Sequence, residues 1–370
     1  MDKKNKKHFP TLIIGDLEIK KPIIQGGMGI GISVSGLASA VANEGGIGVI
    51  STVGNGFEEP DFKSNYREAN LRSLRNEIKK AKSLTKGVLG VNIMLALTDY
   101  DDLFKASMNE GVDIIFMGAG LPLRMPANVT LDELKSSKTK LAPIVSSGKA
   151  ARLIFQTWDR RYDYIPDAVV VEGPKAGGHL GFKSEQIFDP NFSLEKIVPD
   201  VVKEIKIFEE KYNRKIPVIA GGGVYTGADI DKILKLGASA VQMGTRFVAT
   251  HECDASEEFK KAYVECKEED IVIINSPVGL PGRAINSAFL EKVGRGEKTP
   301  ISCPWKCLTT CDYKTAPYCI GIALINSKRG KIQQGYAFCG ANAYRVKEII
   351  SVKELFETLE KEYSEAIIDS

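Results

Sequence analysis

Long apolar runs and a strong net charge are both missing from this chain of 370 residues. No segment approaches the roughly 18 consecutive apolar residues that a membrane-spanning helix requires. The leader Met1–Lys7 also lacks the apolar core of a secretory signal peptide. Fifty basic residues against 47 acidic ones give a net charge of +3, without a motif for nucleic-acid binding. The sequence therefore predicts a cytoplasmic protein that binds neither membranes nor nucleic acid.

Histidine is rare, and so is cysteine over most of the chain. His8, His179 and His251 are the three histidines, so few side chains titrate near neutral pH. Cys253 and Cys266 alone precede residue 300, whereas five of the seven cysteines lie within residues 303–339. In a reducing compartment we expect these thiols to be free or to bind metal rather than to form disulfides.

Short apolar runs that end in glycine or polar residues alternate with helical patterns through the first 250 residues or so. The eight runs are Pro22–Gly27, Ile47–Val53, Val88–Leu95, Ile114–Gly120, Leu141–Ser147, Ala168–Gly173, Pro217–Gly222 and Ala240–Phe247. The helices are predicted over Ser33–Asn43, Glu68–Leu84, Asp99–Asn109, Thr130–Ser137, Lys149–Asp159, Leu194–Tyr212, Gly227–Leu236 and Ser256–Glu265. Eight such units indicate an α/β protein with a TIM (β/α)8 barrel. A doubly wound sheet is less favoured, because Gly26–Gly31 contains no G-x-G-x-x-G placement.

The pattern changes after residue 250. A Pro/Gly-rich loop is expected over Ser276–Arg283, followed by a helical stretch to Val293. Cysteines and turn residues dominate residues 299–345, and Val352–Ser364 reads as one amphipathic helix. We therefore divide the chain into a barrel over residues 1–295 and a Cys-rich C-terminal extension with a closing helix over residues 296–370.

Two glycine clusters end the predicted seventh and eighth strands, where barrels commonly bind phosphate. Gly221, Gly222 and Gly223 follow one strand, and Gly244 and Thr245 follow the other. Glycine exposes its backbone N–H groups to an anion at close range, and the helix that begins near Thr226 would direct its positive end to the same place. The alternative is a structural role, in which these glycines only form tight turns.

Other strand ends carry further candidates. The loop Gln25–Met28 could pack against a flat ring, and Asn92 would place a carboxamide at the mouth of the barrel. Ser147 could face a cofactor or cap the next helix. His179 follows the apolar run Ala168–Val171 within a glycine-rich loop, and it could be a general base, a donor to substrate or a structural histidine.

These segments, in this order, resemble the nitronate monooxygenase family and the related FMN-dependent enoyl-acyl-carrier-protein reductases. The matching motifs are Gln25–Met28, Val91–Ile93, Ala176–His179, Ala220–Gly223 and Gln242–Phe247, and the similarity spans about residues 10–295. Each motif is short, but the ordered set is specific for a family.

The resemblance implies a TIM barrel that binds FMN without a covalent link, with His179 as the residue that takes a proton from a nitroalkane or contacts the nitronate. The candidate cofactor-binding residues are Gln25, Gly26, Gly27, Met28, Asn92, Ser147, Gly178, Gly221, Gly222, Gly223, Gln242, Gly244 and Thr245. The implied activity is oxidation of alkyl nitronates by O2. Reduction of an enoyl thioester with NAD(P)H as reductant is the first alternative, and a non-catalytic flavin-binding barrel is the second. A homodimer is left open.

Four thiols within 17 residues follow the spacing Cys303-x3-Cys307-x3-Cys311-x7-Cys319. If the stretch is helical, residues four apart share one face and the first three thiols converge, with Cys319 returning from the next loop. Four thiolates suit a [4Fe–4S] cluster or structural zinc, although the spacing matches neither the ferredoxin run nor paired C-x2-C motifs. We expect an iron–sulfur cluster, with zinc or unliganded thiols as alternatives.

Overall fold

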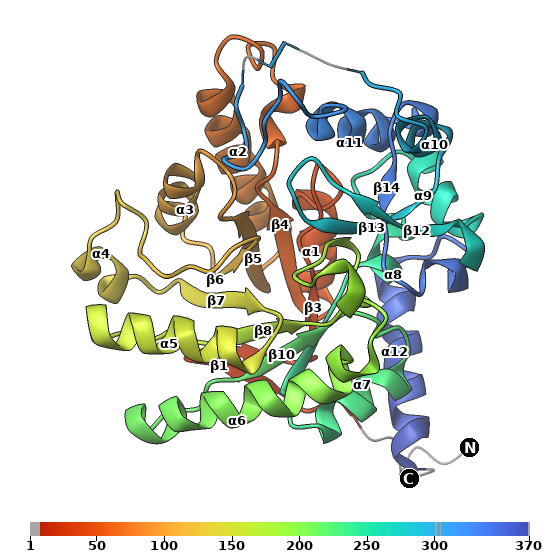
Figure 1. Cartoon of the computed structure of the whole chain (residues 1–370). Helices are drawn as coiled ribbons and strands as arrows, with labels where there is room; N and C mark the ends of the chain where they lie inside the picture. Colours follow the sequence, from red (N-terminus) through yellow and green to blue (C-terminus); the bar gives the residue numbers. More distant parts are fainter. Residues whose placement is uncertain (1–7, 300–301, 304, 369–370) are drawn as a thin grey trace.

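Eight parallel strands close into a barrel in the computed structural model, which describes residues 8–299, 302–303 and 305–368 (Figure 1). The strands are β3 (Ile23–Gln25), β4 (Ile47–Ser51), β5 (Val88–Met94), β6 (Ile114–Gly118), β7 (Lys140–Val145), β8 (Val169–Glu172), β10 (Val218–Gly221) and β11 (Ala240–Met243). They pair in chain order, and β11 returns to pair with β3. Each of the eight predicted runs overlaps one strand, so the predicted TIM barrel is confirmed. The basic leader Met1–Lys7 lies outside the described residues.

Helices connect the strands and cover the outside of the barrel. They are α1 (Ser35–Asn43), α2 (Tyr66–Leu84), α3 (Tyr100–Asn109), α4 (Leu131–Ser136), α5 (Gly148–Tyr162), α6 (Leu194–Tyr212), α7 (Gly227–Lys235), the short α8 (Thr245–Val248) and α9 (Glu257–Val264). Side-chain caps define where several helices begin. Thr130, Ser147 and Thr226 each accept a hydrogen bond from a backbone N–H of the first turn. Within the described residues, no helix is both long enough and apolar enough to cross a bilayer.

A small hairpin seals the amino-terminal end of the barrel. Strands β1 (Leu12–Ile14) and β2 (Leu17–Ile19) pair antiparallel. Leu12, Ile14 and Ile19 are buried in the same cluster as the side chains that fill the barrel interior. That interior set is Ile24, Ile47, Val49, Ile114, Phe116, Ala142, Ala168, Val170, Ile219 and Ala240. The barrel is therefore a packed core with an apolar floor.

A second sheet stands beside the carboxyl ends of the barrel strands. It contains β12 (Ile271–Asn275), β13 (Pro281–Ile285), β14 (Ala337–Phe338) and the two-residue β9 (Gly178–His179), and β13 pairs with each of the other three. The prediction of a loop over Ser276–Arg283 was wrong in its second half, because Pro281 begins β13 and only the turn before it is irregular. This sheet joins the loop of His179 to the C-terminal part of the chain.

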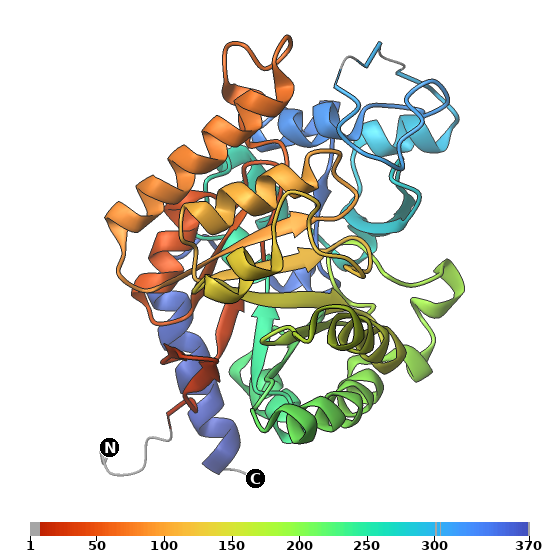
Figure 2. The same ribbon diagram turned by 90° about the vertical axis from the view of Figure 1, so that its left-hand side faces the viewer.

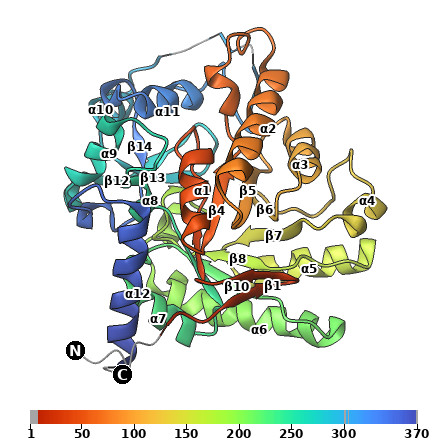
Figure 3. The same cartoon turned by 180° about the vertical axis from the view of Figure 1, so that it is seen from behind.

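The C-terminal segment packs against the barrel. Helix α10 (Ala288–Gly294) ends near residue 295, and α11 (Ile320–Lys328) lies above the barrel, away from the termini (Figure 2). Helix α12 (Val352–Ile368) runs along the outside of the barrel beside α7, where the Glu362 carboxylate accepts the Gly227 N–H at 2.7 Å (Figure 3). The division of the chain at residue 295 stays a prediction.

The stretch from Cys303 to Cys311 is not helical in its described residues, so the predicted convergence of thiols on a helix face was wrong. An isolated bridge joins Leu308 in this stretch to Leu97. Two backbone hydrogen bonds flank the bridge, from the Thr98 N–H to the Cys307 carbonyl and from the Thr309 N–H to the Ala96 carbonyl. These contacts compete with a helix for the same backbone groups.

Candidate active site

A cavity of about 1280 Å³ opens at the carboxyl ends of the barrel strands. Every barrel strand contributes lining residues at or near its carboxyl end. They include Gly26, Ser51, Asn92, Gly118, Ser146, Glu172, Gly222 and Gly244. The loop 175–179, the hairpin 275–281 and the segment 338–342 complete the wall. Small-molecule pockets usually measure about 300–1,000 Å³, so this cavity has room for a cofactor and a second ligand.

The glycine loops after β10 and β11 form one end of the cavity. Gly222 has φ +101°, and a Cβ there would lie 2.8 Å from the Gly173 carbonyl oxygen, so only glycine fits. Gly223 also has a positive φ, of +95°. Within the described residues, the backbone N–H groups of Gly222, Gly223 and Gly244 have no protein partner. Unpaired N–H groups that line a cavity suit an anion such as a phosphate.

Residues from the C-terminal part of the chain brace this end. The Thr245 hydroxyl accepts the Gly340 N–H at 3.0 Å, and the Asn342 carboxamide donates to the Gly223 carbonyl at 2.7 Å. Lys175 lines the cavity beside Gly223 and adds a positive charge. The sequence analysis missed Gly340 and Asn342, because no local motif marks a residue that contacts a loop about 100 positions earlier.

The loop after β3 and the end of β5 form a second wall. A Cβ on Gly27 would lie 2.4 Å from the Asn92 Cβ, so the absence of a side chain lets the loop lie directly against Asn92. Ser33 fixes the loop, because its hydroxyl accepts the Met28 N–H at 2.8 Å. Gly26, Gly27, Met28, Asn92 and the neighbouring Gln242 all line the cavity, as a surface against which a planar ring could lie.

Three predicted cofactor residues do not line the cavity. Gln25 is fully buried in the barrel wall, where its side-chain carbonyl accepts the Val49 N–H. Ser147 caps α5 by accepting the Ala150 N–H, and its neighbour Ser146 lines the cavity instead. Gly221 is buried within β10 between β8 and β11. For these residues, barrel structure accounts for the sequence pattern.

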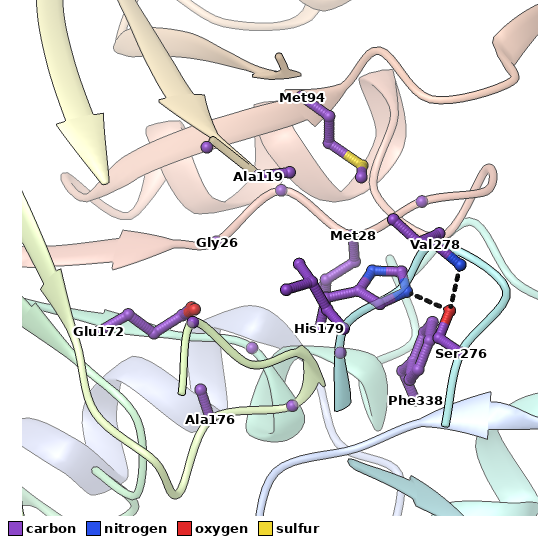
Figure 4. Close-up of a pocket in the computed structure, with 18 of the residues that line it drawn as sticks. Gly26, Met28, Met94, Ala119, Glu172, Ala176, His179, Ser276, Val278 and Phe338 are labelled. Atoms are coloured by element: carbon purple, nitrogen blue, oxygen red, sulfur yellow. Dashed lines mark hydrogen bonds between the residues drawn. The ribbon is translucent and has the colours of Figure 1, made fainter. Parts of the chain in front are cut away.

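His179 faces the cavity from the edge of the second sheet (Figure 4). Its Nε2 lies 2.7 Å from the Ser276 hydroxyl oxygen, which also accepts the Val278 N–H at 3.2 Å. The Phe338 ring packs edge-on against the imidazole, with centroids 5.0 Å apart. Burial lowers the pKa of His179 to about 4, so the imidazole is neutral at physiological pH.

The contact with Ser276 determines which ring nitrogen is available for chemistry. When Nε2–H donates to the Ser276 oxygen, Nδ1 carries a free lone pair, and this nitrogen points away from Ser276 (Figure 4). In that tautomer the Ser276 hydroxyl hydrogen is also free to donate to a ligand. His179 and Ser276 together then offer one proton acceptor and one donor. The sequence analysis missed Ser276, because it lies 97 positions from His179.

Glu172 is a second titratable group in the cavity. It ends β8, and burial raises the pKa of its carboxyl group to about 7. No ion pair joins it to Lys175 among the described residues. A carboxyl group with this pKa is partly protonated at neutral pH, so it can accept or donate a proton there.

Arg283 holds the loop that carries His179. It is 4% exposed, and its Nη1 donates to the carbonyl oxygens of Pro174 at 2.6 Å and Ala176 at 2.7 Å. Gly177 lets this loop lie against the backbone of Cys339, where a Cβ would approach to 2.6 Å. Arg283 therefore positions the segment between Glu172 and His179 without lining the cavity itself.

Comparisons with known proteins agree with this geometry. A family model described as nitronate monooxygenase matches residues 11–362. The chain is 28% identical over 317 residues to a probable nitronate monooxygenase of Staphylococcus saprophyticus, covering 76% of this chain and 80% of that protein. It is 27% identical over 288 residues to a (3aS,4S,5R,7aS)-5-hydroxy-7a-methyl-1-oxo-octahydro-1H-indene-4-carboxyl-CoA dehydrogenase of Mycobacterium tuberculosis, covering 78% and 68%. The structure of FabK from Thermotoga maritima matches with a TM-score of 0.72 and 30% identity over 95% of both chains.

Proposed function

Because the chain belongs to the nitronate monooxygenase family, a family of FMN-dependent oxidoreductases, we propose that it oxidises alkyl nitronates with O2. The observation that carries the proposal is a neutral His179 in a cavity that also offers an anion-binding end and a flat wall. A neutral imidazole can take the α-proton of a nitroalkane, which is the step that produces the nitronate.

The residues present fit FMN. The unpaired N–H groups of Gly222, Gly223 and Gly244, together with Lys175, would hold its phosphate. The wall of Gly26–Met28 and Asn92 would lie along its ring system. Bound FMN would supply an acceptor for substrate electrons and a donor for O2.

The protein side chains would handle the substrate's proton and charge. Nδ1 of His179 takes the proton, and the Nε2–H···Oγ contact with Ser276 holds the ring in the required tautomer. The Ser276 hydroxyl would donate to a nitro oxygen, and the Phe338 ring packs edge-on against the imidazole. Neutral His179 thereby avoids the desolvation penalty of a buried cation before the reaction.

Replacement of His179 by Asn tests the role. We expect a loss of about 10²–10⁴-fold in kcat/KM for a neutral nitroalkane, but a much smaller loss for preformed nitronate, because no proton has to be removed from it. FMN content, read from the visible absorption band, should not change. The matched control is His251→Asn, at an exposed position outside the cavity lining. Equal losses with both substrates, or near-full activity with the nitroalkane, would contradict the base role.

Reduction of an enoyl thioester by NAD(P)H is the second candidate. The cavity extends beyond the flavin site along an apolar wall that includes Phe57, Leu97, Leu121, Leu308 and Leu324, which suits a long acyl chain. The similarity to FabK, an enoyl-acyl-carrier-protein reductase, and to a carboxyl-CoA dehydrogenase favours thioester substrates. Stopped-flow mixing separates the two: rapid bleaching of the flavin by NAD(P)H and none by nitronate would favour the reductase.

Other predictions from the sequence remain proposals. They are a cytoplasmic location, NAD(P)H as a reductant and a homodimer. A non-catalytic flavin-binding barrel would bind FMN and react with neither nitronate nor NAD(P)H, so the same mixing experiment tests it.

A further inference from the structure

The four cysteines of the C-terminal segment line a single small cavity beside the main one. Cys303, Cys307, Cys311 and Cys319 all contribute to its wall, although no helix brings them together. Burial, and then the charges of Cys319, Cys303 and Cys311, raise the pKa of Cys307 to about 12. The four cysteines therefore line one cavity and also lie close together in the sequence.

The protein holds this cavity against the barrel. The bridge between Leu97 and Leu308 ties the cysteine stretch to the segment that follows β5. Cys307 packs against an aromatic cluster that includes Phe62, Tyr66 and Trp305. The indole N–H of Trp305 is buried and has no partner among the described residues. The cysteine stretch therefore packs against buried aromatic side chains at Cys307.

Cys319 lines the same cavity as the N-cap residue of α11, and its side chain makes no capping hydrogen bond. Its sulfur is therefore not engaged in capping the helix.

The spacing of the sulfurs bears on the ligand's size. Among the described residues, no three His, Cys, Asp or Glu side chains are arranged to hold a metal ion as they stand. A single zinc ion needs four sulfurs at about 2.3 Å from one centre. A cluster of four irons and four sulfides is larger, so its cysteine ligands lie farther apart. A cluster therefore accepts a wider spacing of its cysteine ligands than zinc does.

We propose that Cys303, Cys307, Cys311 and Cys319 bind one [4Fe–4S] cluster in this small cavity. Cys307 lines both this cavity and the main one, so the cluster would stand at the wall of the flavin site. The proposal goes beyond the function given above and does not depend on which substrate is oxidised or reduced.

Iron and acid-labile sulfide analysis of the full chain, purified without oxygen and reconstituted with iron and sulfide, tests the proposal. We expect about four of each per chain, with a broad visible absorption that dithionite bleaches and an electron paramagnetic resonance signal in the reduced state. Dithionite should deliver about three electrons per chain to a protein with cluster and FMN, against about two for FMN alone. These readouts on the unaltered chain do not require nitronate or NAD(P)H, so they are independent of the proposed activity.

Single replacements assign the ligands. Cys307→Ala and Cys311→Ala should each reduce iron to below about one per chain while FMN remains bound, because the phosphate loops belong to other segments. The matched control is Cys266→Ala, a buried cysteine outside the small cavity, which should keep its iron. Fewer than about one iron per chain in the unaltered protein, zinc in place of iron, or unchanged iron in both ligand variants would each overturn the proposal.

Discussion

Acidification distinguishes a buried His179 from an ordinary histidine. With its pKa lowered to about 4 by burial, the imidazole is still about 97% neutral at pH 5.5, whereas a histidine at its usual pKa of about 6.5 is only about 9% neutral there. If neutral His179 takes the substrate proton, kcat/KM for a nitroalkane should be nearly constant between about pH 8 and 5.5. An ordinary histidine would lose about tenfold over the same range.

The measurement is kcat/KM for a neutral nitroalkane across that range, with FMN in excess. Glu172 complicates it, because burial raises the pKa of its carboxyl group to about 7, and its ionisation could produce a separate limb. The variant Glu172→Gln removes that group while keeping the shape of the side chain. An acid limb near pH 6.5 that persists in Glu172→Gln would refute the assignment of a buried, low-pKa base to His179.

Four further tests address other parts of the site. Gly222→Ala should weaken FMN binding at least tenfold by fluorescence titration, because a Cβ would come within 2.8 Å of the Gly173 carbonyl oxygen at a positive φ; unchanged affinity would remove Gly222 from the phosphate site. Ser276→Ala should lower kcat on a nitroalkane about tenfold or more while KM changes little, and a change in KM alone would indicate a binding role. Arg283→Met leaves two buried carbonyl groups unpaired, so the free energy of unfolding in urea should fall by about 2–4 kcal/mol. A loss below about 0.5 kcal/mol would mean that the loop finds other donors. Stability should also fall as the pH drops below about 6.5, since unfolded His179 then binds a proton that the folded protein excludes, and His179→Asn should reduce this slope in thermal melts.

The barrel could be predicted because each buried strand corresponds to a short apolar run of consecutive residues. Ile114–Gly118 is a short apolar run, and it is one of eight such runs that alternate with helical patterns. The glycine loops at one end of the cavity could be predicted for the same reason, since Gly222 and Gly244 directly follow strands. Patterns formed by consecutive residues can be recognised in a single sequence.

The second sheet could not be predicted, because its strands pair with segments far away in the sequence. Strand β9 has only two residues, Gly178 and His179, and they are ordered by pairing with β13 about 100 positions later. Ser276 and Arg283 act on the His179 loop across the same distance. The cysteine spacing was compatible with a helix. Backbone hydrogen bonds to Ala96 and Thr98 determine the conformation instead, and no residue near Cys307 in the sequence indicates these bonds.

The sealed floor of the barrel has a consequence for the order of events in turnover. The hairpin β1–β2 and the interior side chains fill the barrel below the cavity, within the part of the chain that the structure describes. Whatever enters the cavity from the carboxyl ends of the strands must therefore leave by the same side. Two reactants that need the place next to His179, in front of a ring on Gly26–Met28, would have to use it in turn. Such shared access favours ping-pong kinetics, in which the first product departs before the second reactant binds.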